Sequence, residues 1–393
     1  MPYFWKRLSF FLLLSAILFS SLPLSALAAP APAHSSTPSV SAEAAILIEA
    51  ESGKVVFSKN ASTRMPMAST TKIMTALVAL EQVAPDTVIP VSAAAVGVEG
   101  SSVYLTDGEQ LTLEQLLYAM LLESANDSAA AIAIGVAGSV EAFADLMNRK
   151  AESLGLTDTH FTNPHGLDHK EHYTTAQELA AIARCALQNE LFRTIVSTRK
   201  TTIPHDGTEG VRLLINHNKL LRLYDGCIGV KTGFTKHSGR CLVSAAEKNG
   251  VTMIAVTLNA SDDWNDHMRM LDYGFSRFES VVLCEAGVLL RPLTLVGGTD
   301  SYVMITNMKS LRATLPTDHG TIETVIETPR FEYAAVAEGQ KLGKAVFLCD
   351  TDGDAVPEVI GEIPLNACCS VGQKVQKRTF WQWLSSLFGH SSP

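Results

Sequence analysis

The spacing of apolar and polar positions changes several times along the chain, and each change predicts a different element. Residues 44–49 and 55–59 are two short, largely apolar runs on either side of a Glu-Ser-Gly-Lys segment, which predicts two strands joined by a turn that contains glycine. From Ser69 to Glu81 the apolar positions recur at helical spacing, and Pro85 then ends the pattern. Further helical patterns cover residues 113–122, 128–136, 140–154 and 176–188.

Strand-like spacing returns in the second half of the chain. The runs 228–235, 240–247 and 251–258 are joined by Gly-containing turns and predict an antiparallel meander. Residues 42–279 thus have strands at both ends and helices between them, which predicts an α+β domain with one antiparallel sheet flanked by helices. Residues 280–372 alternate in short apolar stretches without helical periodicity, which predicts a smaller all-β C-terminal domain.

The N-terminal residues have the pattern of an export signal. Lys6 and Arg7 precede the apolar run 8–24, and the small-residue triplet at 26–28 follows it, so residues 1–28 are predicted to be a secretory signal peptide. An uncleaved N-terminal anchor is the less favoured alternative. Residues 29–41 are small, uncharged and rich in proline, which predicts a flexible linker.

The last segment, residues 373–393, is predicted to be an amphipathic tail that associates with a membrane. Three cations come first, and an apolar and aromatic set that would share one helix face follows: Phe380, Trp381, Leu384, Leu387 and Phe388. Such a helix is too short to span a bilayer but suits the interface, with its cations near anionic lipid. A terminal helix docked on the protein remains the alternative.

Composition narrows the class of protein. The 393 residues are 47% hydrophobic and 18% charged, as in a globular chain large enough for about two domains. The formal net charge of -9, without a long basic block, argues against a nucleic-acid partner. Seven widely scattered cysteines do not have the pattern of a disulfide framework.

A serine three residues before a lysine at the start of a helix is the first candidate for chemistry. Ser69 and Lys72 have this spacing, which places a hydroxyl beside an amine on one helix face. The N-terminus of a helix also favours negative charge developing on the serine oxygen. Ser197 and Lys200 repeat the spacing, but they run into a strand-like segment, and we interpret that match as coincidence.

Two further motifs follow in the chain. Ser124 and Asn126 lie at a predicted turn between two helices, although a similar Ser-x-Asn occurs at Ser58. Lys231, Thr232 and Gly233 form the only Lys-Thr-Gly of the chain and lie in a predicted strand. Glycine there leaves the face of the strand open, so that an extended peptide can bind beside it.

In the order S-x-x-K, S-x-N and K-T-G, on helix, turn and strand, these motifs are the signature of β-lactamases and penicillin-binding proteins. Over nearly the whole mature chain, the sequence resembles the serine D-alanyl-D-alanine carboxypeptidases, the low-molecular-mass penicillin-binding proteins. The segments 121–129, 161–168 and 229–235 look like blocks of that family. Ala125 stands where many relatives have Asp, a departure that puts little in doubt. The resemblance implies the transpeptidase-like fold of these enzymes.

The resemblance also implies a mechanism. Ser69 would attack the penultimate carbonyl of a peptidoglycan stem peptide that ends in D-Ala-D-Ala, and Lys72 would accept its proton. Ser124 would relay a proton to the leaving D-Ala, and Asn126 would bind the substrate amide. Lys231 and Thr232, followed by Gly233, would hold the terminal carboxylate. The backbone N–H groups of Ser69 and Phe234 would form the oxyanion hole.

The resemblance further implies an exported enzyme of peptidoglycan biosynthesis and cell shape. It would lie at the outer face of the bacterial cytoplasmic membrane, and β-lactams would inhibit it covalently at its serine. No cofactor is expected.

Other interpretations are less favoured. A metal site at His160, His165, His169 and His172 does not have a standard zinc spacing, and the Asp-rich segment 350–354 lacks the glycine position of a calcium loop. A β-lactamase and a catalytically silent wall-binding protein remain as the alternative functions.

Overall fold

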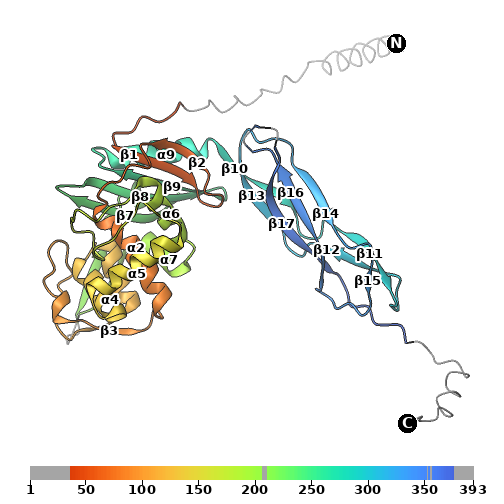
Figure 1. Cartoon of the computed structure of the whole chain (residues 1–393), viewed down its shortest axis with the longest axis horizontal. Coiled ribbons are helices and arrows are strands. Elements are labelled where there is room, and N and C mark those ends of the chain that lie inside the picture. Colours follow the sequence, from red (N-terminus) through yellow and green to blue (C-terminus); the bar gives the residue numbers. More distant parts are fainter. Residues whose placement is uncertain (1–35, 206–209, 352, 355, 376–393) are drawn as a thin grey trace, which may run out of the picture. The chain divides into compact units, whose positions relative to one another are not determined.

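The computed structural model describes residues 36–205, 210–351, 353–354 and 356–375 (Figure 1). The predicted signal peptide, most of the predicted linker and the predicted tail from residue 376 onward lie outside the described residues. The end of the predicted linker already contacts the folded part, because Val40 is buried and the Ser41 hydroxyl donates to the Asp266 carboxylate at 2.6 Å. The folded part therefore begins slightly before the predicted boundary at Ala42.

One antiparallel sheet of five strands organises the first half of the molecule. Its order is β2-β1-β9-β8-β7, so strands from both ends of the predicted α+β domain lie side by side. The bounds are β1 (Ala44–Glu49), β2 (Val55–Lys59), β7 (Cys227–Thr235), β8 (Gly239–Lys248) and β9 (Val251–Leu258). These agree with the five predicted strands to within a residue or so at their ends, and the prediction of a single sheet is confirmed.

Helices cover both faces of this sheet. Ile46 and Ile48 of β1 belong to the hydrophobic core shared with the helices of the middle of the chain, whereas Ala45 and Leu47 pack in a second core with α9 (Asp263–Phe275). Alternate residues of a strand point to opposite faces, so a strand covered on both sides is apolar throughout. All six residues of β1 are accordingly buried.

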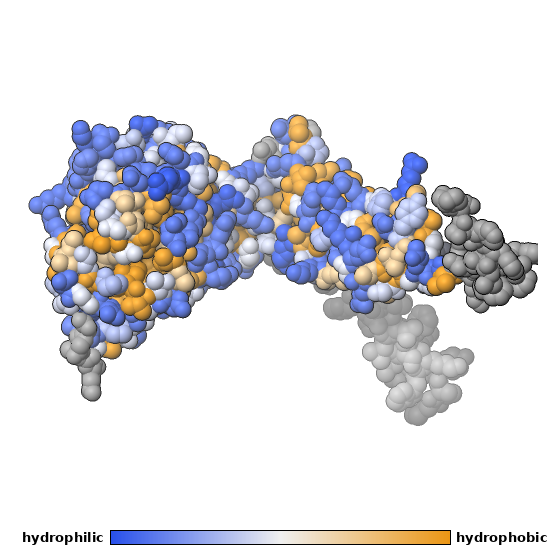
Figure 2. Space-filling model, turned by 60° about the horizontal axis from the view of Figure 1, so that its bottom comes forward, coloured by the Kyte–Doolittle hydropathy of each residue, from blue (hydrophilic) through white to orange (hydrophobic). Residues whose placement is uncertain are grey.

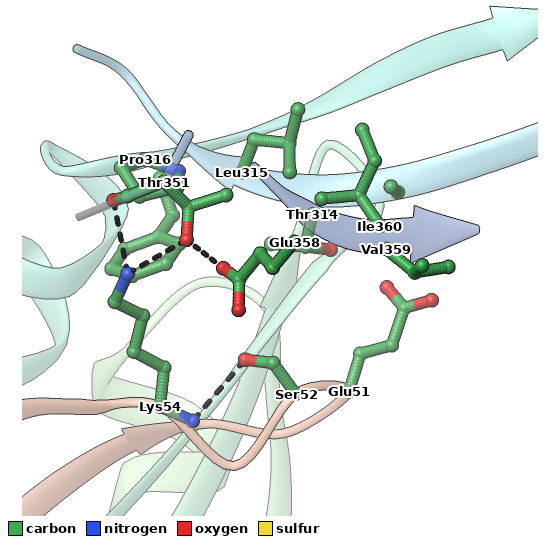
Figure 3. Close-up of a pocket in the computed structure, with 12 residues that line it drawn as sticks. Glu51, Ser52, Lys54, Thr314, Leu315, Pro316, Thr351, Glu358, Val359 and Ile360 are labelled. Carbon is green, nitrogen blue, oxygen red and sulfur yellow. Dashed lines mark hydrogen bonds between the residues drawn. The ribbon is translucent and has the colours of Figure 1, made fainter. Parts of the chain in front are cut away.

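The turn that joins β1 to β2 is held by its own side chains. The Glu49 carboxylate accepts the backbone N–H groups of Glu51 at 2.8 Å and of Ser52 at 2.7 Å. The Lys54 N–H then donates to the Ser52 hydroxyl at 3.2 Å, as Figure 3 shows. Gly53 completes the turn at a φ of +78°, in the left-handed region that glycine adopts most easily.

The helices predicted from periodicity are present in the middle of the chain. They are α2 (Lys72–Gln82), α3 (Leu113–Leu122), α4 (Asn126–Ala137), α5 (Val140–Ser153) and α6 (Ala176–Ala186). Side-chain caps account for three of the starts. Thr112 and Gln115 form a capping box before α3, the Ser139 hydroxyl accepts the N–H of Ala142 at the start of α5, and the Thr175 hydroxyl accepts the N–H of Glu178 at the start of α6.

Several short or polar elements were not predicted. They are the 3-10 turns η1 (Ala68–Thr71) and η2 (Ala93–Ala95), the helices α7 (Glu190–Ser197), α8 (Leu220–Leu223) and α9, and the strands β3 (Val88–Pro90), β4 (Gln110–Thr112) and β6 (Val211–Ile215). Strand β5 (Lys200–Pro204) corresponds to the strand-like segment that follows Ser197 in the sequence. The helical period of α9 is concealed because its buried face includes polar residues. His267, for example, lies in the core between the hydroxyls of Ser244 and Thr257.

The C-terminal part is built from strands, as predicted. A six-stranded sheet has the order β14-β16-β17-β12-β11-β15, and β10 pairs with β13. The bounds are β10 (Phe278–Cys284), β11 (Arg291–Val296), β12 (Tyr302–Thr306), β13 (Leu311–Pro316), β14 (Glu323–Glu327), β15 (Glu332–Tyr333), β16 (Lys341–Cys349) and β17 (Glu358–Ala367). The described residues from 276 to 375 contain no helix. Lys374, at the start of the predicted tail, still donates its N–H to the Gly297 carbonyl at 2.8 Å.

Some apolar side chains lie on the surface. Val211, Leu213 and Ile215 occupy the exposed face of β6, and Figure 2 shows apolar areas gathered among hydrophilic residues on one face of the molecule. In the part of the chain that the structure describes, no single helix is long and apolar enough to cross a membrane. Only α4 and α5 together, bent by 83° at their junction, meet that criterion.

A buried ion pair joins β6 to the segment before β4. Arg212 and Glu109 have side chains that are 8% and 1% exposed, and the guanidinium donates to both carboxylate oxygens, at 2.5 and 2.9 Å. Burial acts to raise the pKa of Glu109, but hydrogen bonds from Arg212 and from the Thr106 N–H outweigh it and hold the pKa below its usual value.

We predict that Arg212→Met lowers the free energy of unfolding at pH 7 by about 3–5 kcal/mol, because it leaves the charge of the buried Glu109 carboxylate without a cation. A carboxyl whose pKa is lowered by folding stabilises above its unfolded pKa, and this contribution is lost as the pH falls through the folded pKa. The cost measured by urea denaturation should therefore shrink in acid. Arg212→Met combined with Glu109→Leu is the control and should recover most of the loss. A single variant as stable as the parent would contradict the prediction.

Candidate active site

Ser69 lies in a tight turn at the edge of the core rather than in the α-helix itself. The predicted helix start at Ser69 is corrected: residues 68–71 form the 3-10 turn η1, and α2 begins at Lys72. Two threonine hydroxyls close the turn, since Thr70 donates to the Met67 carbonyl at 2.6 Å and Thr71 to the Ala68 carbonyl at 2.8 Å. The side chain of Ser69 remains partly exposed.

Lys72 is fully buried, and its amine contacts three oxygen atoms. Nζ lies 3.1 Å from the Ser69 hydroxyl, 2.7 Å from Oδ1 of Asn126 and 2.6 Å from the carbonyl of His165. The spacing of three residues therefore brings the serine and lysine together across the junction of η1 and α2, as predicted from the sequence.

Ser124 and Asn126 lie where α3 gives way to α4. Ser124 has a φ of +60°, and Asn126 is the first residue of α4, so Asn126 belongs to a helix and not to the predicted turn. The amide of Asn126 is oriented by its neighbours: Nδ2 donates to the Glu99 carbonyl at 2.5 Å, which leaves Oδ1 for Lys72. Asp127 accepts from the Ser102 hydroxyl and from three backbone N–H groups, those of residues 103, 105 and 128, and so holds the segment beside Asn126.

Lys231, Thr232 and Gly233 lie on β7, the edge strand of the five-stranded sheet. Lys231 is 2% exposed, and its Nζ donates to the Ser124 hydroxyl at 3.1 Å and to the Thr232 carbonyl at 2.9 Å. Gly233 has a role in the fold in addition to the predicted one. A Cβ at this position would lie 3.1 Å from the Ser69 nitrogen, so the missing side chain lets the nucleophile turn approach the strand.

Burial dominates the electrostatics of the two lysines. It lowers the pKa of Lys72 well below the usual value, and the positive charge of Lys231 lowers it further, while Asp127 acts in the opposite direction. Burial also lowers the pKa of Lys231, to about 7. Both effects on Lys72 favour the uncharged form of its amine, which is the form that a general base requires.

The loop that carries the four histidines packs directly against this centre. The His165 carbonyl binds Lys72, and the Pro164 carbonyl accepts the hydroxyl of Thr75 on α2 at 2.6 Å. Among the described residues, no three His, Cys, Asp or Glu side chains are grouped so that they could hold a metal ion. The loop instead supplies backbone carbonyls to the lysine helix.

A cavity of about 470 Å³ opens beside these groups. Ser69, Ser124, Thr232, Gly233 and Phe234 line it, together with residues that sequence reasoning missed: Ser101, His217, Lys219, Arg240, Asp263 and Trp264. Arg240 donates to Asp263 at 2.6 Å and is partly exposed. Its place could have been found from the register of the β7–β8 hairpin, where Arg240 pairs with Phe234.

The second Ser-x-x-Lys match does not form such a centre. Ser197 is the last residue of α7 and donates its hydroxyl to the Thr194 carbonyl at 3.0 Å, whereas Lys200 begins β5. The two residues belong to different elements, in line with the interpretation of this match as coincidence.

Comparison with known proteins agrees with the geometry. The model of the peptidase S11 family, described as D-alanyl-D-alanine carboxypeptidase, matches residues 31–262. The chain belongs to this family. It is 32% identical over 372 residues to the D-alanyl-D-alanine carboxypeptidase DacF of Bacillus subtilis, and the match covers 92% of this chain and 94% of DacF.

Solved structures extend the likeness of this S11 carboxypeptidase to its fold. Penicillin binding protein 5 of Haemophilus influenzae superposes with a TM-score of 0.63 at 26% identity, over 86% of this chain and all of that structure. The Streptomyces K15 DD-transpeptidase has a TM-score of 0.59 at 33% identity, over 62% of this chain and all of that structure. The predicted fold class is confirmed: an α+β transpeptidase-like fold with a C-terminal β domain. The chain is thus a serine-type D-Ala-D-Ala carboxypeptidase.

Proposed function

We propose that this carboxypeptidase removes the terminal D-Ala from peptidoglycan stem peptides through an acyl-enzyme on Ser69. The observation that carries the proposal is the contact of a fully buried Lys72 amine with the Ser69 hydroxyl. A serine needs an adjacent base to become a nucleophile, and burial keeps this amine able to be that base.

The partners of Lys72 define the direction of the proton transfer. A neutral amine has two N–H groups and one lone pair. The Asn126 Oδ1 and the His165 carbonyl can only accept, so they take the two N–H groups. The lone pair is then left for the third neighbour, Ser69, whose hydroxyl donates its proton to Nζ as the oxygen attacks the carbonyl.

Ser124 is proposed to complete the first half of the reaction. As the bond between the penultimate carbonyl and the D-Ala nitrogen breaks, the leaving amine needs a proton. The Ser124 hydroxyl lines the cavity and accepts a hydrogen bond from Lys231 at 3.1 Å, so it can pass on its own proton and be resupplied. Water then attacks the acyl-enzyme, releasing the shortened peptide and restoring Ser69.

Substrate binding is assigned to the strand and to the turn opposite it. The Ser69 and Phe234 N–H groups form the proposed oxyanion hole, and Gly233 allows the close approach of strand and turn that this hole requires. Thr232 and Lys231 would hold the terminal carboxylate, and Asn126 the substrate amide. Lys231 is buried, whereas Arg240, which lines the same cavity, supplies a positive charge that is more exposed to solvent.

Neither alternative function is as well supported. A β-lactamase would leave the C-terminal β domain without a use, and a silent wall-binding protein would not need Lys72 and Lys231 both buried at the serine. The relatives compared above are named as carboxypeptidases, a transpeptidase and a penicillin binding protein. We infer further that the enzyme is exported, acts at the outer face of the cytoplasmic membrane, and is acylated by β-lactams that mimic the substrate terminus.

Incubation with penicillin should produce a single covalent penicilloyl adduct, located on Ser69 and not on Ser197. Of these two serines, only Ser69 has a buried amine at its hydroxyl and lines the cavity, whereas the Ser197 hydroxyl donates to the Thr194 carbonyl. Mass spectrometry of the intact protein followed by peptide mapping measures this, and Ser69→Ala is the control that should remain unmodified. An adduct on Ser197, or none, would show that the site is wrongly assigned.

Lys72→Arg should abolish acylation by peptide and penicillin, with a loss of at least about 10²- to 10⁴-fold in rate, the range for a missing general base. Arg keeps the charge and most of the length, but its pKa above about 12 prevents it from acting as a base. Stopped-flow acylation measures the loss, and thermal unfolding verifies that the variant folds.

Lys231→Arg is the matched comparison, because Arg keeps the cation at the proposed carboxylate position and loses only the capacity of Lys231 to return a proton to Ser124. It should lose less acylation than Lys72→Arg. The base role of Lys72 would be refuted if Lys72→Arg were acylated at nearly the parent rate.

Deletion of residues 376–393 should move the enzyme from the membrane fraction to the soluble fraction, with activity on a small D-Ala-D-Ala peptide unchanged. This truncation keeps the bond between Lys374 and Gly297 that ties the end of the β domain. Substituting Phe380, Trp381 and Leu384 by serine in the full chain tests whether the apolar face is responsible. Retention of the truncated protein on membranes would assign the anchoring to another segment, and unfolding would assign the tail to the protein core.

A further inference from the structure

A chain of hydrogen bonds runs from the histidine loop to the residue before the nucleophile. The backbone N–H of Thr162 donates to Nδ1 of His172 at 3.0 Å. Nε2 of His172 lies 2.8 Å from the Thr71 hydroxyl, which in turn donates to the Ala68 carbonyl at 2.8 Å. His172 and Thr71 are 3% and 1% exposed, so no solvent-exposed group interrupts the chain.

The partners fix which nitrogen of His172 bears the proton. Nδ1 accepts a backbone N–H and so carries no hydrogen, which places the ring proton on Nε2. The Thr71 hydroxyl uses its own hydrogen for the Ala68 carbonyl, so its oxygen is free to accept from Nε2. Each of these three hydrogen bonds therefore has one donor and one acceptor, and donation runs in one direction from the Thr162 N–H to the Ala68 carbonyl.

The last link acts on the peptide bond between Ala68 and Ser69. The C=O of Ala68 and the N–H of Ser69 belong to one planar unit, in which the two groups point in opposite directions. A bond that holds the carbonyl therefore also sets the direction of the Ser69 N–H. We propose that His172 is a positioning residue that acts through the Thr71 hydroxyl to aim the Ser69 N–H into the oxyanion hole. This inference rests on the proposed role of Ser69.

The backbone at this point needs such a restraint. Ala68 has a φ of +46°, in the left-handed region, which costs a residue with a Cβ about 1–2 kcal/mol. Such a conformation persists only where the surroundings enforce it. Gly166 packs closely against the same carbonyl, because a Cβ there would lie 2.0 Å from the Ala68 oxygen and 2.9 Å from the Thr71 hydroxyl.

His172 is suited to this role over the whole working range of pH. Burial, together with the positive charges that His165, His160, His169 and Lys72 would present, lowers its pKa to about 3. The imidazole therefore stays neutral where Lys72 acts as a base, and Nδ1 remains an acceptor. Phe161 packs edge-on against the ring, with centroids 5.8 Å apart, and keeps it in place.

Two pairs of variants test the proposal. His172→Phe keeps a ring but loses the hydrogen bond to Thr71, whereas His172→Gln places an amide N–H near the position of Nε2. Thr71→Val removes the hydroxyl at nearly constant shape, and Thr71→Ser retains it. His172→Phe and Thr71→Val should each lower the penicillin acylation rate constant about 10- to 10²-fold, less than the roughly 10²- to 10³-fold loss of a whole oxyanion donor. The dissociation constant of the initial complex should change little, and Gln and Ser should restore most of the rate.

A double variant and a spectroscopic readout distinguish positioning from a general loss of structure. If His172 acts through Thr71, the variant with both His172→Phe and Thr71→Val should be no slower than the slower single variant. In infrared spectra of the penicilloyl enzyme, the acyl carbonyl should absorb at higher frequency in His172→Phe and Thr71→Val, because a misaligned oxyanion hole polarises it less. Thermal unfolding identifies variants that do not fold, and Thr71→Val tests the same link if His172→Phe is among them.

Each result decides between the two proposals. Acylation of the parent at Ser69 together with parent-like rates and carbonyl frequencies in Thr71→Val would overturn the positioning inference alone. Additive losses in the double variant would overturn it as well. No acylation of the parent at Ser69 would overturn the proposed function and this inference with it.

Discussion

The burial of two lysine amines in one site is the constraint on which the rest of this structure depends. Lys72 and Lys231 are 0% and 2% exposed, and an amine removed from water is costly unless polar groups surround it. No single element can supply those groups. The histidine loop contributes a carbonyl, α4 contributes the Asn126 amide, the α3–α4 junction contributes Ser124, and β7 contributes the Thr232 carbonyl. The helices and the edge strand must therefore meet at this point, and the order of motifs along the chain is a consequence.

The same constraint explains why three glycines lie around the site. Gly100, Gly166 and Gly233 each stand where a backbone or a polar side chain approaches closely, and a Cβ would lie 2.6 Å from Asn126 Nδ2, 2.0 Å from the Ala68 carbonyl or 3.1 Å from the Ser69 nitrogen, respectively. Each of these neighbours belongs to the group that holds or borders the serine and its lysine. Glycine is needed here chiefly for the close approach of segments, and its freedom of backbone rotation is secondary at Gly233, which lies within a regular strand.

The sequence was sufficient for the strands of the main sheet and for the longer helices with apolar buried faces. It was insufficient for the short helix α7 and for α9, whose buried face includes polar residues. The five strands of the sheet and the helices α2 to α6 follow from periodicity, because each has an apolar face. Helix α9 was not predicted because two polar residues, Asp266 and His267, occupy core positions. Asp266 is hydrogen-bonded to Ser41, and His267 is hydrogen-bonded to the hydroxyls of Ser244 and Thr257. The motif residues were found because they lie close together in sequence or match a known order. Arg240 and Trp264 line the same cavity through the folding of β8 and α9 onto it. The register of the β7–β8 hairpin places Arg240 beside Phe234, whereas no local pattern marks Trp264.

The two buried amines also constrain the order of proton transfers in the proposed mechanism. Two positive charges this close in a site of low polarity repel each other, so the pair resists holding both protons, and their titrations are coupled. Attack by Ser69 adds a proton to Lys72, which raises the energy of the pair while Lys231 is charged. The repulsion is relieved if the Ser124 hydroxyl protonates the leaving amine and takes a replacement proton from Lys231, whose Nζ is hydrogen-bonded to it. Acylation and departure of D-Ala are then linked, because the proton that Lys72 gains is offset by the proton that leaves through Ser124. A site with one buried lysine would lack this coupling, which gives Lys231 a reason to be buried beyond the binding of a carboxylate.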